Sequence, residues 1–422
     1  MKESDFARKR LNLVMVLDIS GSMSAPFNEY YYDLSGRQVR ISEKYRYMPK
    51  IEVAKDAMLA IADQLNDSDR LGIVLFDDRA SILQQLNRDR RTDIDDIQDR
   101  IYEIRPGGGT NLSAGMGLAT DIIGRYANMD PWVYENRIIF LTDAMPNLGE
   151  TGEYSLLRLL KKNADNRIYT TFFGIGVDFN TELIDYITKV KGANYYSIHS
   201  PGDFMERVEN EFDYMVTPLV FNLRLTLDAQ GWDIEKVYGS PEADQSTGEL
   251  MKVNTLFPSQ KKDGETRGGM ILLKLKKRGT DTGSLRLKVS YDDRAGNRDY
   301  SEAMVYLESA RPEYFDNSGI RKGILLARYA DLMKDWIIDE REHAHWSRPW
   351  EPRVNPESGI IIPLFMSGQW ERQSLPLTVS SPYRNIFRDF SLYFADEMNQ
   401  IGDNSLEQEL RLLQQLGGKY RD

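Results

Sequence analysis

The first half of the chain alternates short apolar runs with amphipathic segments, and this alternation restricts the fold more than any other feature. The apolar runs are nearly continuous, which is typical of parallel strands buried on both faces of a sheet. They occupy residues 11–18, 70–76, 137–143, 167–176 and 193–198. The segments between them repeat apolar residues at helical spacing, and we expect helices at 50–65, 93–104, 111–127, 153–164, 181–192 and 202–216. Strands that alternate with helices predict a doubly wound, Rossmann-like α/β domain.

The spacing of apolar residues changes twice along the chain. From about residue 219 the period becomes two, with Gly, Asp and Pro between the runs, which predicts an antiparallel β-sandwich. From about residue 311 helical spacing returns, with one stripe formed by Leu325, Tyr329, Leu332 and Trp336. We therefore expect an α/β domain over 1–216, a β-sandwich over 217–310 and a helical C-terminal region over 311–422.

The composition limits the classes of partner and the chemistry. Lys and Arg number 54 against 65 Asp and Glu, and this net charge of −11 argues against a general nucleic-acid binder. The absence of cysteine excludes disulfides, zinc thiolate sites and thiol nucleophiles, and it is compatible with a bacterial protein. No run approaches the roughly 18–20 apolar residues of a membrane-spanning helix, and the polar N-terminus does not resemble a signal peptide. We expect a cytoplasmic protein or the soluble part of a longer exported one.

Oxygen-bearing side chains follow three of the expected strands. The strand 11–18 runs into "DISGSMS", the loop "RPGGGTN" carries a threonine behind three glycines, and "FLTD" ends in an aspartate. Ligand sites of open α/β sheets lie at the carboxyl ends of the strands, so we expect these side chains to converge. Two carboxylates and three hydroxyls suit a hard cation, with Mg²⁺ as the first choice and Mn²⁺ or Ca²⁺ as alternatives. The candidate ligands are Asp18, Ser20, Ser22, Thr110 and Asp143. The Asp-x-Ser-x-Ser motif taken alone is also compatible with a helix N-cap.

These five residues in their strand context resemble the metal-ion-dependent adhesion site of von Willebrand factor type A domains. The resemblance covers about residues 10–216. It implies that the two serines bind the metal directly, the threonine directly or through water, and the aspartates mostly through water. One departure is Ala144, which stands where many members of the family have glycine.

The resemblance also implies a function. A cation held mainly by neutral hydroxyls keeps positive charge and an open coordination position, which an Asp or Glu carboxylate of a partner protein can fill. The implied role is metal-dependent protein–protein interaction, as an adhesion or adapter module rather than an enzyme. The alternative is a cytoplasmic partner of an ATPase chaperone or metal-insertion complex. We expect no catalytic or organic-cofactor residues, because the sequence lacks a nucleophile elbow, an HExxH motif and a Walker lysine loop.

An insert of about 25 residues separates the Ser-rich motif from the helix that starts near Pro49. The insert is rich in Tyr and Arg, which are enriched in interface hot spots. Because it leaves the strand beside the expected metal, we hypothesise that it forms a recognition surface on the same face. Its candidate residues are Tyr30, Tyr31, Tyr32, Arg40, Tyr45 and Tyr47, with Phe27 among the aromatic residues of the insert. The alternative is a small hairpin whose tyrosines pack on the domain itself.

Two further features lead to hypotheses. The helix at 202–216 runs into the expected sandwich without a flexible linker, so metal occupancy could be coupled to the orientation of the second domain. Near the end of a C-terminal helix, a group of Glu and His residues could form a transition-metal site. The alternative is that they are ordinary polar residues of a helix end. The residues concerned are Glu340, Glu342, His343 and His345.

Overall fold

The structure is a computed structural model and describes most of the chain. The described residues are 8–27, 30–32, 38–40, 48–87, 94–143, 151–176, 186–187, 189–198, 201–240, 242–258, 261–262, 265–266, 270–279, 283–306, 315–347, 353–354, 361–362 and 377–418. They form two compact units. One holds the α/β domain and the antiparallel sheets, and the other holds the C-terminal helices.

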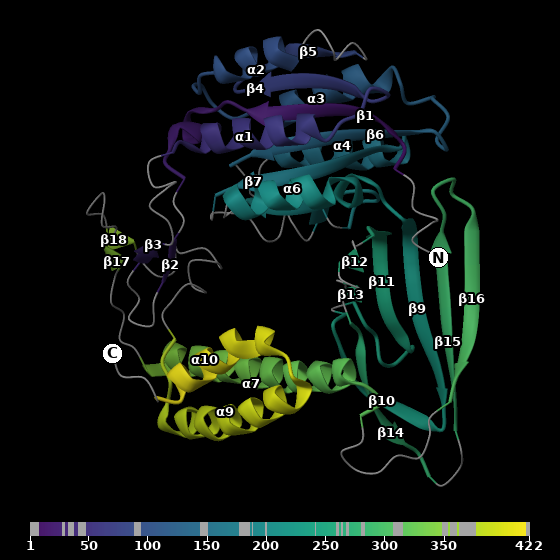
Figure 1. The fold of residues 1–422 in the computed structure, drawn as a ribbon, viewed down its shortest axis with the longest axis vertical. Helices are drawn as coiled ribbons and strands as arrows, with labels where there is room; N and C mark the ends of the chain where they lie inside the picture. Colours follow the sequence, from purple (N-terminus) through teal and green to yellow (C-terminus); the bar gives the residue numbers. More distant parts are fainter. Residues whose placement is uncertain are drawn as a thin grey trace. The chain divides into compact units, whose positions relative to one another are not determined.

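A six-stranded sheet with the order β5-β4-β1-β6-β7-β8 forms the centre of the α/β domain (Figure 1). Five strands pair in parallel, which confirms the expected α/β fold. These are β1 (Arg10–Asp18), β4 (Arg70–Phe76), β6 (Tyr134–Thr142), β7 (Ile168–Ile175) and β8 (Asn194–Ile198). The edge strand β5 (Ala80–Asn87) pairs antiparallel with β4 and was not predicted. Because β5 lies at an edge and is only partly buried, it lacks the apolar run of a central strand.

Helices cover both faces of this sheet, so β1 is buried on both sides. Leu13 and Met15 face a core formed with α1 (Lys50–Asp63), α2 (Ile94–Tyr102) and α6 (Pro201–Val216). Val14 and Val16 face a second core formed with α3 (Leu112–Gly124) and α4 (Thr151–Asp165). The alternation of side chains along a strand therefore explains why the run is apolar throughout. The helix expected at 181–192 lies mostly outside the described residues.

Two antiparallel sheets follow the α/β domain, as expected. One has the order β11-β9-β15-β16 and the other pairs β10 with β14. Apolar residues from both sheets share one cluster, which makes the arrangement a sandwich. The strands are β9 (Val220–Gln230), β10 (Trp232–Tyr238), β11 (Glu249–Leu256), β14 (Leu272–Lys277), β15 (Ser284–Asp292) and β16 (Arg298–Val305), and a short ladder joins β12 (Lys261–Lys262) to β13 (Glu265–Thr266). The sequence prediction missed β11.

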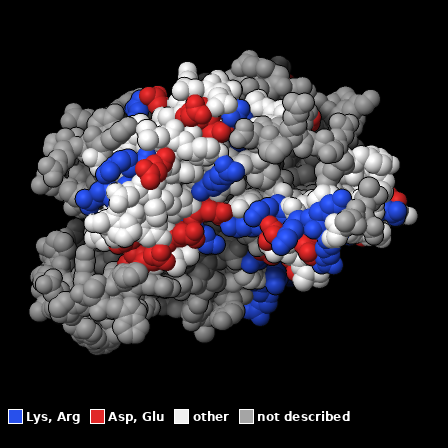
Figure 2. Space-filling view, turned by 90° about the horizontal axis from the view of Figure 1, so that it is seen from below, with Lys and Arg blue, Asp and Glu red and all other residues white. Residues whose placement is uncertain are grey.

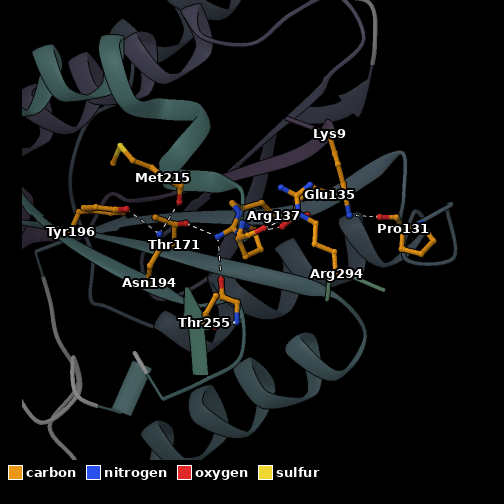
Figure 3. Close-up of polar contacts among 12 residues, drawn as sticks. Lys9, Pro131, Glu135, Arg137, Thr171, Asn194, Tyr196, Met215, Thr255 and Arg294 are labelled. Carbon is orange, nitrogen blue, oxygen red and sulfur yellow. Dashed lines mark hydrogen bonds and ion pairs between the residues drawn. The ribbon is translucent and has the colours of Figure 1, made fainter. Parts of the chain in front are cut away.

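A buried ion pair lies where the α/β domain meets the sandwich (Figure 3). The Arg137 side chain on β6 is fully buried, and its Nη2 lies 3.2 Å from Glu135 Oε1. Arg137 Nη1 also donates to Thr171 Oγ1 on β7 at 2.9 Å and to the carbonyl of Gly192 at 3.3 Å. Burial raises the pKa of the Glu135 carboxyl, and the positive charge of Arg137 opposes that rise. Each charge of this buried pair therefore compensates the other.

Residues of the sandwich complete this cluster. The Arg137 guanidinium lies 5.6 Å from the ring centroid of Phe257, which follows β11. Thr255 on β11 accepts a hydrogen bond from the Gly192 N–H at 2.7 Å. The α/β domain and the sandwich thus share one buried polar cluster, drawn in Figure 3.

The connection from α6 to β9 is short and fixed by hydrogen bonds. The Arg294 side chain donates to the Pro218 carbonyl at 2.8 Å, and the Leu219 N–H donates to the Leu256 carbonyl at 2.7 Å. No flexible linker lies between Val216 and Val220 in this described part of the chain. Coupling between metal occupancy and the orientation of the sandwich stays a prediction.

The C-terminal unit is helical, as expected. It contains α7 (Ser318–Ser347), α9 (Ser381–Ile401), the short 3-10 helix η4 (Asn404–Leu406) and α10 (Glu407–Leu416), with a small ladder of β17 (Arg353–Val354) and β18 (Ile361–Ile362). Leu325 and Trp336 of α7 are buried in its core with Phe387 and Phe394 of α9. The expected stripe on α7 is therefore confirmed. The domain limits at 216/217 and 310/311 stay predictions. None of the described helices is long and apolar enough to cross a membrane.

Charges of both signs are interspersed on the face shown in Figure 2. Elsewhere in the described residues, exposed ion pairs join Arg207 with Glu211 on α6 and Lys288 with Asp228 in the sandwich. Such exposed pairs contribute little to stability, about 0–1 kcal/mol each.

Candidate metal centre

Asp18 at the end of β1 anchors the candidate centre. Its carboxylate is fully buried; Oδ1 accepts from the Ser20 N–H at 2.8 Å, and Oδ2 accepts from Thr142 Oγ1 at 2.5 Å. Burial raises the pKa of Asp18, while the hydrogen bonds from Ser20 and Thr142 lower it and the nearby charge of Asp143 raises it further. Asp18 therefore fixes the loop after β1 to the end of β6.

The two serines and Asp143 form one hydrogen-bonded chain. Ser20 Oγ and Ser22 Oγ lie 3.0 Å apart, and Ser22 Oγ donates to Asp143 Oδ1 at 2.8 Å. Ser20 is buried, whereas Ser22 is exposed on the short helix η2 (Gly21–Ser24). The carboxyl ends of β1 and β6 thus bring four of the five predicted residues into one oxygen cluster.

The loop that carries Thr110 lies against the serine loop through its backbone. The Gly21 N–H donates to the Gly108 carbonyl at 3.1 Å, and the Gly107 N–H donates to the Ile19 carbonyl at 2.8 Å. Gly108 has a φ of +83°, which explains the need for glycine in this turn. Thr110 itself is exposed, and its hydroxyl is not part of the hydrogen-bonded chain. The structure therefore places Thr110 in the adjoining loop but does not establish it as a ligand.

A lysine that the sequence analysis did not assign to the site also contacts Asp143. Lys50 Nζ, at the start of α1, lies 3.0 Å from Asp143 Oδ2. Thr142, which holds Asp18, was also missed. The signal for Thr142 was its place directly before Asp143 at the end of β6. Lys50 and Asp143 are 93 positions apart in the sequence, which hides their contact.

The donor set fits a hard cation. Every predicted ligand offers oxygen, which Mg²⁺, Mn²⁺ and Ca²⁺ prefer. Within the part of the chain that the structure describes, no group of three or more His, Cys, Asp or Glu side chains is placed to hold a metal. A cation bound at this centre therefore depends on the serine hydroxyls as well as on the carboxylates.

Backbone hydrogen bonds close the base of the insert beside this centre. The Phe27 N–H donates to the Met48 carbonyl at 2.7 Å, and Pro26 and Pro49 form a β-bridge. Phe27 is fully buried in the core with β1 and α1. Phe27, which the sequence places among the aromatic residues of the insert, therefore contributes its ring to the domain core.

The insert itself contains a short ladder of β2 (Tyr30–Tyr32) and β3 (Gln38–Arg40). Their backbones are described, but their side chains are not, and Tyr45 and Tyr47 lie outside the described residues. The hypothesis that these side chains form a recognition surface stays a prediction.

In the second candidate metal cluster, in the C-terminal unit, the Glu340 carboxylate has a structural role. Glu340 accepts from Thr378 Oγ1 at 2.6 Å and from the Ser380 N–H at 3.0 Å, which fixes the start of α9 to α7. The side chains of Glu342, His343 and His345 lie outside the described part of the chain.

Comparison with known proteins identifies the domain. The family model of the von Willebrand factor type A domain matches residues 13–146, which include all five predicted ligands. The chain contains a von Willebrand factor type A domain. We call the α/β domain that contains residues 13–146 the A domain. Its presence confirms the family resemblance, although the match does not establish a complete metal site.

The relatives of the A domain align over part of their length. Inter-alpha-trypsin inhibitor heavy chain H1 of Mesocricetus auratus is 24% identical over 230 residues, which are 52% of this chain and 22% of that protein. The alignment thus spans about a fifth of the relative.

Among solved structures, a von Willebrand factor type A protein from Catenulispora acidiphila matches 88% of this chain and 89% of its own, with a TM-score of 0.48 and 16% identity. Proximal thread matrix protein 1 from the mussel byssus, solved with a zinc-occupied MIDAS motif, matches 49% of this chain and 45% of its own, with a TM-score of 0.34 and 20% identity.

Proposed function

We propose that the A domain is a protein–protein interaction module whose binding depends on a divalent cation. The observation that carries this proposal is the oxygen cluster at the carboxyl ends of β1 and β6, where Ser22 lies within hydrogen-bonding distance of both Ser20 and Asp143. The relative reported above is named as a heavy chain of inter-alpha-trypsin inhibitor, and this name supports a role in protein interaction rather than in catalysis.

Each residue of the cluster has a distinct part in this proposal. As the family resemblance implies, the hydroxyls of Ser20 and Ser22 would hold the cation directly, Asp143 and Asp18 would act mostly through water, and Thr110 would complete the set from the adjoining loop. The cation, with Mg²⁺ as the first choice, supplies positive charge and a coordination position for an Asp or Glu carboxylate of the partner. The buried Asp18 keeps the loop in place, because its two oxygens are used by Ser20 and Thr142.

The exposed Ser22 offers the cleanest test of the metal site. Ser22→Ala removes one proposed ligand without opening a core cavity, so we expect Mg²⁺ or Mn²⁺ affinity to fall by more than about tenfold. Isothermal titration calorimetry on the full chain measures this. Ser24→Ala, an exposed serine on the same turn, is the matched control and should bind like the wild type. Failure of the wild type to bind Mg²⁺, Mn²⁺ or Ca²⁺ would remove the metal from the proposal.

We further propose that the insert contributes the recognition surface beside the cation. Its ends are held together at Phe27 and Met48, so residues 28–47 can be replaced by Asn-Gly, a sequence that closes a tight hairpin. The shortened chain should keep its thermal stability and its Mn²⁺ affinity. It should lose a partner that the full chain binds in Mg²⁺ and releases in EDTA. Unchanged partner affinity would assign the insert to the scaffold instead.

A further inference from the structure

We propose that Lys50 is a built-in counter-cation that holds Asp143 and limits how strongly the centre takes up a metal. This inference rests on the proposed function, since it concerns the same oxygen cluster. It assigns a role in setting metal affinity to a residue outside the set of five ligands.

The contact between the lysine and the centre is direct and mostly shielded from water. Lys50 Nζ lies 3.0 Å from Asp143 Oδ2, and the side chains are 17% and 2% exposed. The other oxygen of Asp143 accepts from Ser22 at 2.8 Å. Both oxygens of Asp143 are therefore engaged, one by a hydroxyl and one by an ammonium group.

The position of Lys50 is fixed by two independent features. Its backbone N–H donates to the Ala25 carbonyl at 2.9 Å, next to the β-bridge that closes the insert. Its aliphatic stem passes the end of β7, where a Cβ on Gly176 would lie 3.3 Å from Lys50 Cε. Gly176 also has a φ of +107°, which L side chains rarely adopt. The base of the insert and the absence of a side chain at Gly176 thus allow the ammonium group to point at Asp143.

The charges explain why this position matters. Asp18 and Asp143 supply two carboxylates and Lys50 one ammonium group, so Lys50 removes half of the negative charge that attracts a cation. A divalent ion bound beside Asp143 would be repelled by the ammonium group. Even at the dielectric constant of water, a separation of about 6 Å makes this repulsion weaken binding by at least about tenfold. Without a metal, the ammonium group compensates the buried Asp143 carboxylate. Lys50 and the metal therefore compete for the same carboxylate.

The test compares Lys50→Met with Lys50→Arg, which keeps the charge, and with Lys162→Met, which removes an exposed lysine on α4. Calorimetry and electron paramagnetic resonance measure Mn²⁺ affinity in the full chain, and thermal unfolding is recorded in EDTA and in Mn²⁺. We expect Lys50→Met to bind Mn²⁺ about tenfold more tightly. It should also unfold at a lower temperature in EDTA, and Mn²⁺ should close that gap. Both control variants should bind like the wild type.

The outcomes separate this inference from the proposed function. Equal or weaker Mn²⁺ binding by Lys50→Met, with binding by the wild type intact, overturns the inference and leaves the metal site. Binding by Lys50→Met alone supports the inference and shows that the lysine replaces the metal in the natural chain. Absence of binding in every variant overturns both.

Discussion

Arg137→Leu is expected to lower the free energy of unfolding of the unit that holds the A domain by about 3–5 kcal/mol. The substitution leaves Glu135, which is 4% exposed, without the largest of its compensating charges. It also removes the donors to Thr171 and to the Gly192 carbonyl. Urea denaturation followed by far-UV circular dichroism measures the loss. A loss below about 1 kcal/mol would show that the pair is not needed for the junction.

A double variant separates the lost charge from the lost volume. Replacing both partners, as in Glu135→Met with Arg137→Leu, removes the unpaired carboxylate, so we expect most of the stability to return. A double variant as unstable as Arg137→Leu would instead assign the effect to the contacts with the sandwich.

The pH dependence of Arg137→Leu has a definite sign. Burial already raises the pKa of Glu135, and loss of Arg137 raises it further. The native state then binds the proton of Glu135 more tightly than the unfolded state, so the variant is least stable above the raised pKa. Its stability should recover as the pH falls through the raised pKa towards the ordinary value of a glutamate. Repeating the urea titration between pH 7 and pH 5 tests this.

Phe387→Ala is expected to destabilise the helical unit by about 3–5 kcal/mol. The ring is fully buried and meets Trp336 edge-on, with 5.4 Å between the ring centroids. Differential scanning calorimetry of the full chain should show the transition of the helical unit at a lower temperature and the other transition unchanged. Arg384→Ala, an exposed position one turn earlier on α9, is the control for helix propensity. A single transition that shifts as a whole would contradict independent units and the predicted limit near residue 310.

The sequence was most informative where local pattern and tertiary position agree. The continuous apolar run of β1 predicts a strand buried on both faces, since alternate side chains must each meet a helix layer. Parallel strands place their carboxyl ends at one edge, so Asp18 and Asp143 could be predicted to meet although many residues separate them. The same argument placed the serine loop at that edge. The edge strand β5 and the partly buried β11 escaped prediction, because one-sided burial leaves only a weak alternating pattern.

Contacts between distant polar residues were decided by the tertiary structure alone. Nothing in the local sequence shows that Lys50 contacts Asp143, that Phe27 belongs to the core rather than to the insert, or that Arg137 is fully buried. A polar side chain has the same local pattern whether it faces water or a buried partner, and only the packing of neighbouring elements distinguishes the two. The sequence by itself therefore determined the A fold and the chemistry of its candidate metal centre. The packing of α1, β6 and the sandwich decided which charges compensate one another.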